Sequence, residues 1–120
     1  MLRTILVAKI HRATVTKCDL NYIGSISIDK EIIEEAGILE NERVEVFDID
    51  NGNRFSTYVI AAAGGSKEIG INGAAARLVH PGDRLIILSY GHMEAKEAQA
   101  HQAKIVVLNE KNEIISAMEK

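Results

Sequence analysis

Gly24 and Ser25 are the two residues of this chain whose types and order could alter the backbone itself. Glycine adopts backbone conformations that are closed to other residues, and it leaves its own carbonyl carbon unshielded. The Ser25 hydroxyl lies within reach of that carbonyl, so a strained bond here could undergo an N→O acyl shift from amide to ester. Taken alone, a Gly-Ser pair is more typical of a simple turn. The rest of the chain has to decide between these interpretations.

Other patterns with known chemistry are not found in the sequence. Residues 64–67 (Gly-Gly-Ser-Lys) lack the spacing of a phosphate-binding loop, and no G-x-S-x-G motif of a serine hydrolase occurs. A serine hydrolase is therefore disfavoured as the function of this chain. The histidines show no metal-ligand spacing, and we expect no metal site; they are His11, His80, His92 and His101.

Size and composition indicate one compact domain. The 120 residues are 47% hydrophobic, which is typical of a globular chain. A net charge of −3 and an aromatic content of 4% disfavour nucleic-acid binding. No apolar run approaches the roughly 20 residues that span a bilayer, and Lys9 interrupts an N-terminal segment too short for a secretory signal. A single cysteine, Cys18, fits a reducing cytoplasm, so we expect a cytoplasmic protein without membrane contact.

Alternating apolar residues predict a chain built mainly of short strands. We expect about seven, drawn from residues 4–17 (one strand, or two broken near 9–11), 25–28, 42–49, 54–62, 68–71, 85–88, 104–108 and 113–118. Short helices are expected between an Asp29 cap and a Gly37 stop, in a turn capped by Asn72, and over residues 93–100. Asn51-Gly52 predicts a hairpin and residues 80–83 a tight turn. These elements favour a small β-rich barrel with helical inserts.

Almost the whole chain resembles the pyruvoyl-dependent aspartate α-decarboxylase family. The resemblance is carried by motifs in residues 1–4 (Met-Leu-Arg-Thr), 9–12 (Lys-Ile-His-Arg), 19–20 (Asp-Leu), 22–25 (Tyr-Ile-Gly-Ser), 36–40 (Ala-Gly-Ile-Leu-Glu), 51–58 (Asn-Gly-Asn-Arg-Phe-Ser-Thr-Tyr), 71–76 (Ile-Asn-Gly-Ala-Ala-Ala) and 80–83 (His-Pro-Gly-Asp). Each motif is weak alone, whereas their order in a chain of this length is highly specific.

The resemblance implies a mainly β fold, a double-psi β-barrel with short helical inserts, and a homotetramer with active sites between subunits. It also implies a proenzyme that cuts itself between Gly24 and Ser25 into a β chain, residues 1–24, and an α chain, residues 25–120. The implied cofactor is a covalent pyruvoyl group made from Ser25. The implied reaction converts L-aspartate to β-alanine and CO₂ for pantothenate and coenzyme A synthesis. Whether cleavage is spontaneous or needs a maturation factor stays open.

The resemblance also assigns roles in self-processing and catalysis. Ser25 is the nucleophile, Thr57 donates to the oxyanion that forms at Gly24, and Asn72 is linked to processing. In the mature enzyme the pyruvoyl ketone would form a Schiff base with the substrate amine and accept the electrons released by CO₂ loss. Tyr58 matches the family's proton donor.

Binding a dicarboxylate requires two cations or equivalent donors. Lys9 and Arg54 are the expected cations, and Arg54 can bind bidentately. The backbone N–H groups of residues 73–75 (Gly73, Ala74, Ala75) suit an anion, and Thr57 belongs to the same expected site. His11, which shares one face of an extended strand with Lys9, is expected to help orient the site.

Two questions remain open at the level of sequence, one about the strand that carries Thr57 and Tyr58 and one about the function. In a regular strand Thr57 and Tyr58 point to opposite faces, so either a bulge re-aims one of them or they serve sites with different neighbours. The competing function is a non-catalytic barrel that binds a ligand or partner protein, with Gly24-Ser25 as a plain turn.

Overall fold

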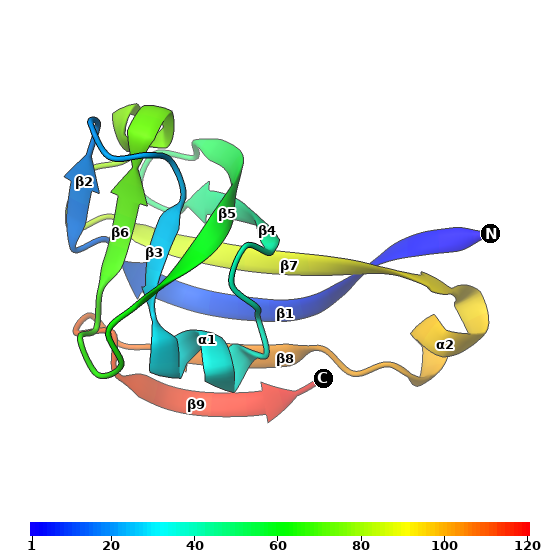
Figure 1. The fold of residues 1–120 in the computed structure, drawn as a ribbon. Helices are drawn as coiled ribbons and strands as arrows, with labels where there is room; N and C mark the ends of the chain where they lie inside the picture. The colour runs from blue at the N-terminus through cyan, green and yellow to red at the C-terminus, as the bar shows by residue number, and fades with distance from the viewer.

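A computed structural model describes all 120 residues as nine strands in one mixed sheet with three short helices (Figure 1). The strands are β1 (Leu2–Thr14), β2 (Lys17–Asp19), β3 (Ile26–Asp29), β4 (Arg43–Asp48), β5 (Arg54–Ala62), β6 (Ile69–Asn72), β7 (Arg84–Glu94), β8 (Lys104–Leu108) and β9 (Ile114–Glu119). The helices are α1 (Lys30–Ala36), the 3₁₀ helix η1 (Gly73–Arg77) and α2 (Ala95–Ala100). This architecture confirms the predicted mainly β class and agrees with a double-psi β-barrel.

The strand order is β2-β6-β3-β5-β4-β7-β1-β8-β9. Parallel pairs join β1 to β8, β2 to β6 and β3 to β5, and the other neighbours are antiparallel. Strand β1 lies inside the sheet, because it pairs with β7 on one side and β8 on the other. It stays one strand through residues 9–11, and its pairing with β7 shifts register twice, between Leu6 and Ala8 and between His11 and Ala13.

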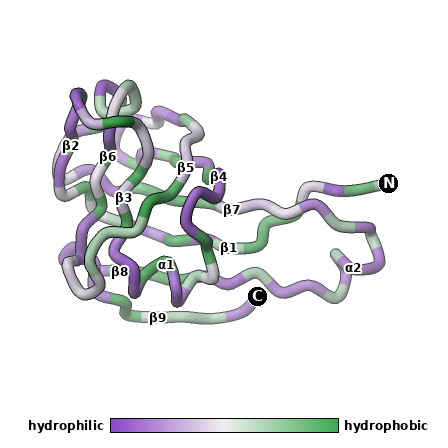
Figure 2. Tube along the Cα trace, viewed as in Figure 1, coloured by the Kyte–Doolittle hydropathy of each residue, from purple (hydrophilic) through white to green (hydrophobic).

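Apolar side chains from the strands and from α1 form one core of 21 buried residues. Helix α1 contributes Ile32, Ile33 and Ala36, the apolar stripe expected from its sequence. Figure 2 shows hydrophobic stretches running through the strands of the barrel. The ends of β1 and β7 project away from the barrel together with α2 (Figure 1), and α2 buries no residue. No helix of the chain has the length and apolar character needed to cross a bilayer.

Strand β7 is the largest departure from the expected elements. The sequence predicts a buried strand over 85–88 and a helix over 93–100, whereas β7 runs to Glu94 and α2 begins at Ala95. The extension is paired throughout with β1, from Thr14 opposite Arg84 to Leu2 opposite Glu94. This long antiparallel partner extends β7 through polar residues whose own sequence gives no strand signal.

Asp29 ties the end of β3 to α1 and to the loop before β6. Its carboxylate accepts backbone N–H groups of Glu31 at 2.8 Å, Gly65 at 3.1 Å and Lys67 at 2.8 Å, and the residue is fully buried. Burial raises the pKa of this carboxyl, but the three backbone hydrogen bonds and the Lys67 charge outweigh it and hold the pKa below its ordinary value. The predicted N-cap is confirmed, and it anchors the strand that follows Ser25.

We expect Asp29→Ala to lower the free energy of unfolding at pH 7 by at least about 3 kcal/mol, because three buried N–H groups lose a charged acceptor. Since folding depresses the carboxyl pKa, its contribution is complete above the ordinary pKa of aspartate and is lost as the pH falls through the depressed value. Urea denaturation at pH 7 and pH 3 measures both effects. Glu35→Ala, on the exposed face of α1, should change stability by less than about 0.5 kcal/mol; equal losses in the two variants would contradict the capping role.

Candidate active site

The bond between Gly24 and Ser25 lies in a backbone conformation that ordinary side chains avoid. Gly24 has φ +38° and Ser25 has φ +83°. A non-glycine residue held in this region costs roughly 1 to 3 kcal/mol and persists only where its surroundings enforce it. Ser25 is also only 2% exposed, although it immediately precedes β3 and follows an exposed loop. The bond at the centre of the sequence hypothesis is therefore both enclosed and strained.

Asn72 holds Ser25 through both its backbone and its side chain. The Asn72 N–H donates to the Ser25 carbonyl at 3.1 Å, and Nδ2 donates to Ser25 Oγ at 3.3 Å. The sequence predicts Asn72 as a helix cap, and η1 does begin directly after it, but the Asn72 side chain makes no capping hydrogen bond. Its buried amide is satisfied by serine hydroxyls instead. The expectation of a capping side chain is therefore wrong.

Gly73 approaches the backbone of Gly24 so closely that a side chain at this position would push against it. A Cβ added to Gly73 would lie 3.0 Å from Gly24 Cα, 3.1 Å from Gly24 N and 3.4 Å from the Tyr22 carbonyl oxygen. Gly73 itself has φ +70°. Because the atoms in the way are backbone, they cannot move aside by a rotamer change. Gly73 therefore sets where the Gly24–Ser25 bond lies.

Gly73→Ala should displace this bond and slow any cleavage of the chain at Ser25 by at least about tenfold, the equivalent of 1.4 kcal/mol in the barrier. Gly52 offers a matched control, because its φ of +79° carries the same backbone strain and nothing lies within 4 Å of its added Cβ. Denaturing mass spectrometry over time measures the uncut fraction. Equal cleavage rates for Gly73→Ala and Gly52→Ala would show that strain alone, and not the close approach, explains the effect.

Tyr58, rather than Thr57, is the β5 side chain that lies against Gly24. The three atoms nearest to a Cβ added at Gly24 all belong to Tyr58, and its Oη is the closest at 3.5 Å. Strand β5 pairs with β4 in an unbroken register, with Tyr58 opposite Arg43 and Thr57 opposite Val44. No bulge in this pairing re-aims either residue, so the first of the two alternatives finds no support.

Thr57 and Tyr58 nevertheless border the same open cavity, which has a volume of about 360 Å³ and is also lined by Arg43 and Ser56. Arg43 is a residue that sequence reasoning missed, and only the β4–β5 register reveals it. Its guanidinium contacts Ser56 Oγ at 3.3 Å and Glu45 at 3.5 Å. The cavity joins a phenol, two hydroxyls and a cation on one surface.

The expected cations Lys9 and Arg54 do not join this group within one chain. Lys9 lies on β1 and lines a different cavity of about 310 Å³, together with His101 and Lys120. Arg54 begins β5 and lies over the ring of Phe47, 4.1 Å from its centroid. The two residues therefore meet neither Ser25 nor each other in the isolated chain.

His11, on the same strand as Lys9, has a buried Nδ1 without a hydrogen-bond partner. Burial lowers its pKa, and the nearby charges of Lys9 and Arg12 lower it further. Its imidazole is therefore favoured in the neutral form. Gly73, Ala74 and Ala75, the expected anion-binding segment, form the first turn of η1 immediately after Asn72.

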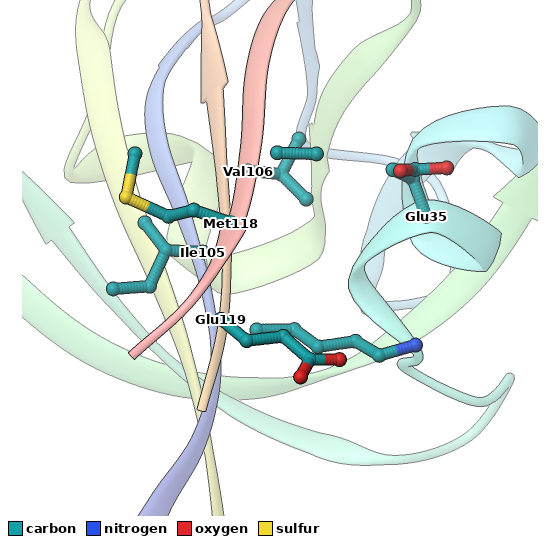
Figure 3. Close-up of a pocket in the computed structure, with 7 residues that line it drawn as sticks. Glu35, Ile105, Val106, Met118 and Glu119 are labelled. Carbon is teal, nitrogen blue, oxygen red and sulfur yellow. The ribbon is translucent and has the colours of Figure 1, made fainter. Parts of the chain in front are cut away.

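The close-up in Figure 3 shows a further cavity of about 200 Å³ between α1 and the pair β8 and β9, lined by Glu35, Ile105, Val106, Met118 and Glu119 among others. It contains none of the expected site residues. A separate group of carboxylates, Asp48, Asp50 and Asp83, lies at the β4–β5 turn and before β7, with oxygens within 4.8 Å of one another.

This carboxylate group has a structural role. Arg84 pairs with Asp50 at 3.0 Å. Burial and the neighbouring Asp83 raise the pKa of Asp48 to about 6. The neutral form of Asp48 thus persists in the folded chain up to about pH 6, and its contribution to stability is present at low pH and lost as the pH rises through that value. The ion pair between Asp50 and Arg84 connects the β4–β5 turn to the start of β7.

The fold and the site together define a mainly β barrel protein in which a strained Gly-Ser bond is enclosed by a carboxamide, a phenol and a close-packed glycine. The chain belongs to the aspartate decarboxylase family, whose model matches residues 1–115. This confirms the resemblance inferred from the ordered motifs.

Three curated relatives are named aspartate 1-decarboxylase. The chain is 55% identical to the protein of Acetivibrio thermocellus over 116 residues, which cover 97% of this chain and 92% of the relative. It is 54% identical to that of Maricaulis maris over 113 residues, with 94% and 93% covered, and 54% identical to that of Clostridium kluyveri over 110 residues, with 92% and 87% covered. The similarity therefore spans nearly the whole of each chain.

Proposed function

We propose that this chain cuts itself between Gly24 and Ser25 and then decarboxylates L-aspartate to β-alanine and CO₂. The products of cleavage are a β chain, residues 1–24, and an α chain, residues 25–120, which begins with a pyruvoyl group made from Ser25. The observation that carries the proposal is the enclosed serine at φ +83° behind a glycine, held by Asn72. The reaction would serve pantothenate and coenzyme A synthesis in the cytoplasm, in keeping with the single free cysteine.

Self-cleavage needs no external reagent in its first step. Ser25 Oγ bonds to the Gly24 carbonyl carbon, the bond from that carbon to the Ser25 nitrogen breaks, and the hydroxyl proton moves to the nitrogen. Relief of the strained φ at Ser25 favours this amide-to-ester shift. Thr57 is assigned as donor to the oxyanion at Gly24, a contribution that is typically about a hundredfold in rate or more.

The ester is then opened by elimination. Loss of the Ser25 Cα proton releases Gly24 as a carboxylate that takes Oγ with it, and dehydroalanine remains. One water hydrolyses the dehydroalanine to the pyruvoyl group and ammonia. The buried position of Ser25 suits such a group, because the departing oxygen vacates a place next to the Asn72 amide.

In the mature protein the pyruvoyl ketone supplies an electron sink for the electrons released when CO₂ leaves. The chain's own residues then bind the substrate and deliver a proton. Tyr58 is assigned as proton donor, since its phenol lies over the cleavage site. Lys9 and Arg54 are assigned to the two carboxylates of L-aspartate, with the N–H groups of residues 73–75 and the His11 imidazole as supporting contacts.

We further propose a homotetramer whose active sites lie between subunits. Within one chain Lys9 lines a cavity that excludes Ser25 and Tyr58, so a neighbouring subunit is needed to supply it. The loop before the cleavage site also exposes large apolar side chains, with Ile23 85% exposed and Tyr22 52% exposed. Such side chains next to a site are suited to a subunit interface.

Two measurements on one preparation test the proposal. Denaturing mass spectrometry should show two fragments, the larger of which reacts with a carbonyl reagent instead of showing an N-terminal serine. The same material should release β-alanine from L-aspartate. A single full-length chain that remains inert to both assays after ageing at working temperature would leave only a non-catalytic barrel.

A further inference from the structure

Ser27 lies in β3, two residues after Ser25, and is almost as deeply buried. Ser25 has a positive φ and precedes the strand, so the shared direction of the two hydroxyls comes from their common hydrogen-bond partner, Asn72, and not from strand alternation. Ser27 is 6% exposed and Ser25 is 2% exposed, while the intervening Ile26 and the following Ile28 are fully buried in the core. The start of β3 and the residue before it therefore place two buried hydroxyls next to apolar core residues.

Both hydroxyls meet the same partner. The side-chain nitrogen of Asn72 donates to Ser27 Oγ at 3.0 Å and to Ser25 Oγ at 3.3 Å. A carboxamide has two N–H groups in one plane, so the bond to one serine fixes the direction of the other. The backbones are fixed as well, because β3 and β6 pair with Ile26 opposite Ile71 and Ser27 opposite Gly70. The Asn72 amide can then still rotate about its own side-chain bonds, and its hydrogen bond to Ser27 restricts that rotation.

We propose that Ser27 is a positioning residue for self-cleavage. It holds the Asn72 amide so that the second N–H meets Ser25 Oγ, which keeps the Ser25 side chain in one rotamer and stabilises the negative charge that develops on Oγ as its proton moves to the Ser25 nitrogen. The inference rests on the proposed self-cleavage. It adds a residue that acts on the nucleophile through Asn72 and does not touch the reacting atoms.

The chemistry limits this role to maturation. Oγ departs with the Gly24 carboxylate during elimination, so the mature α chain has no Ser25 hydroxyl for Asn72 to orient. Ser27 should therefore influence how fast the chain is cut and leave the turnover of cut chains unchanged. A residue that merely supports the fold would affect both steps or neither.

The test follows the cleavage of freshly purified uncut chain by denaturing mass spectrometry. Ser27→Ala should slow cleavage by about tenfold, because Asn72 loses the hydrogen bond that fixes its amide. Ser27→Thr keeps the hydroxyl and should cut within about threefold of the unchanged chain. Ser27→Cys, which keeps the side-chain size but is a weak acceptor, should be slow like Ser27→Ala and gives an answer if the alanine variant folds poorly.

Ser89→Ala is the matched control. Ser89 is a fully buried serine of β7 that hydrogen-bonds to Glu42, so its loss costs a comparable interior hydrogen bond away from Ser25. This control should cut at the normal rate. Per mole of pyruvoyl group, kcat and KM of matured Ser27→Ala should equal those of the unchanged enzyme.

Each other result counts against a specific claim. Normal cleavage in Ser27→Ala, equal slowing in Ser27→Ala and Ser89→Ala, or a lowered kcat per cut chain would overturn the positioning role. If the unchanged chain itself is never cut, the proposed function fails, and the role of Ser27 fails with it.

Discussion

Replacing Ser25 by alanine is expected to leave one uncut chain of 120 residues that forms no β-alanine from L-aspartate. Alanine has no hydroxyl to attack the Gly24 carbonyl, so neither the ester nor the carbonyl group derived from it can form. The loss of activity should be complete, because no other residue supplies an electron sink. Denaturing mass spectrometry and a β-alanine assay on the same preparation measure both consequences.

Alanine at this position carries the same positive φ as serine, so the fold should be retained and far-UV circular dichroism should be unchanged. Ser116→Ala, on β9, is the control and should be cut and active. A Ser25→Ala chain that still appears as two fragments would show that another group performs the cleavage. An uncut chain with full activity would show that catalysis needs no pyruvoyl group.

Tyr58→Phe is expected to lower kcat by a factor between about 10² and 10⁴, the usual range for loss of a positioned proton donor or acceptor. The phenol lies against Gly24, the immediate neighbour of Ser25, from which the pyruvoyl group of the α chain would be made, and we expect this to bring its hydroxyl to the carbon that must be protonated. Cleavage should continue, because phenylalanine keeps the aromatic ring against Gly24. Activity should be expressed per mole of pyruvoyl group, so that maturation and turnover are separated.

Tyr90→Phe provides the comparison for this second experiment. Tyr90 is similarly exposed, at 43% against 38% for Tyr58, but it lies on β7 and borders a different cavity with Thr4 and His92. Its kcat should stay within about twofold of the unchanged enzyme. If Tyr58→Phe also stays within twofold, the proton comes from another donor, and the assignment of Tyr58 is wrong.

Short elements with strong local signals were predictable from the sequence. Strand β5 has the bounds that its pattern predicts, residues 54–62, and α1 lies between its Asp29 cap and Gly37 in the left-handed conformation. These features depend on side chains within a few positions of one another. By contrast, the full length of β7 depends on β1, seventy or more positions away along the chain, and no local pattern encodes that pairing.

The residues of the candidate site likewise differ in how far the sequence alone could predict them. Gly24 and Ser25 can be selected from the sequence, but the dipeptide indicates only a turn, and its strain and burial become visible only when Asn72 and Gly73 are brought against it. Ser27 had one usable signal, its spacing of two from Ser25 on a strand. Arg43 had none, because its proximity to Tyr58 arises from the register between β4 and β5. Lys9, His11 and Arg54 stay predictions, since one chain does not group them with Ser25.

The place of β1 within the sheet has a consequence for the two fragments. The proposed β chain, residues 1–24, would carry β1 and β2, and β1 is hydrogen-bonded to a neighbouring strand along both of its edges. If the chain is cut as proposed, the two fragments should therefore stay together as a noncovalent heterodimer held by these strand pairings. Unfolding of such a cut protein would separate two molecules, so its reassembly would be bimolecular and concentration-dependent, whereas an uncut chain would refold as one molecule. Self-cleavage would thus leave the folded state intact while making refolding depend on protein concentration.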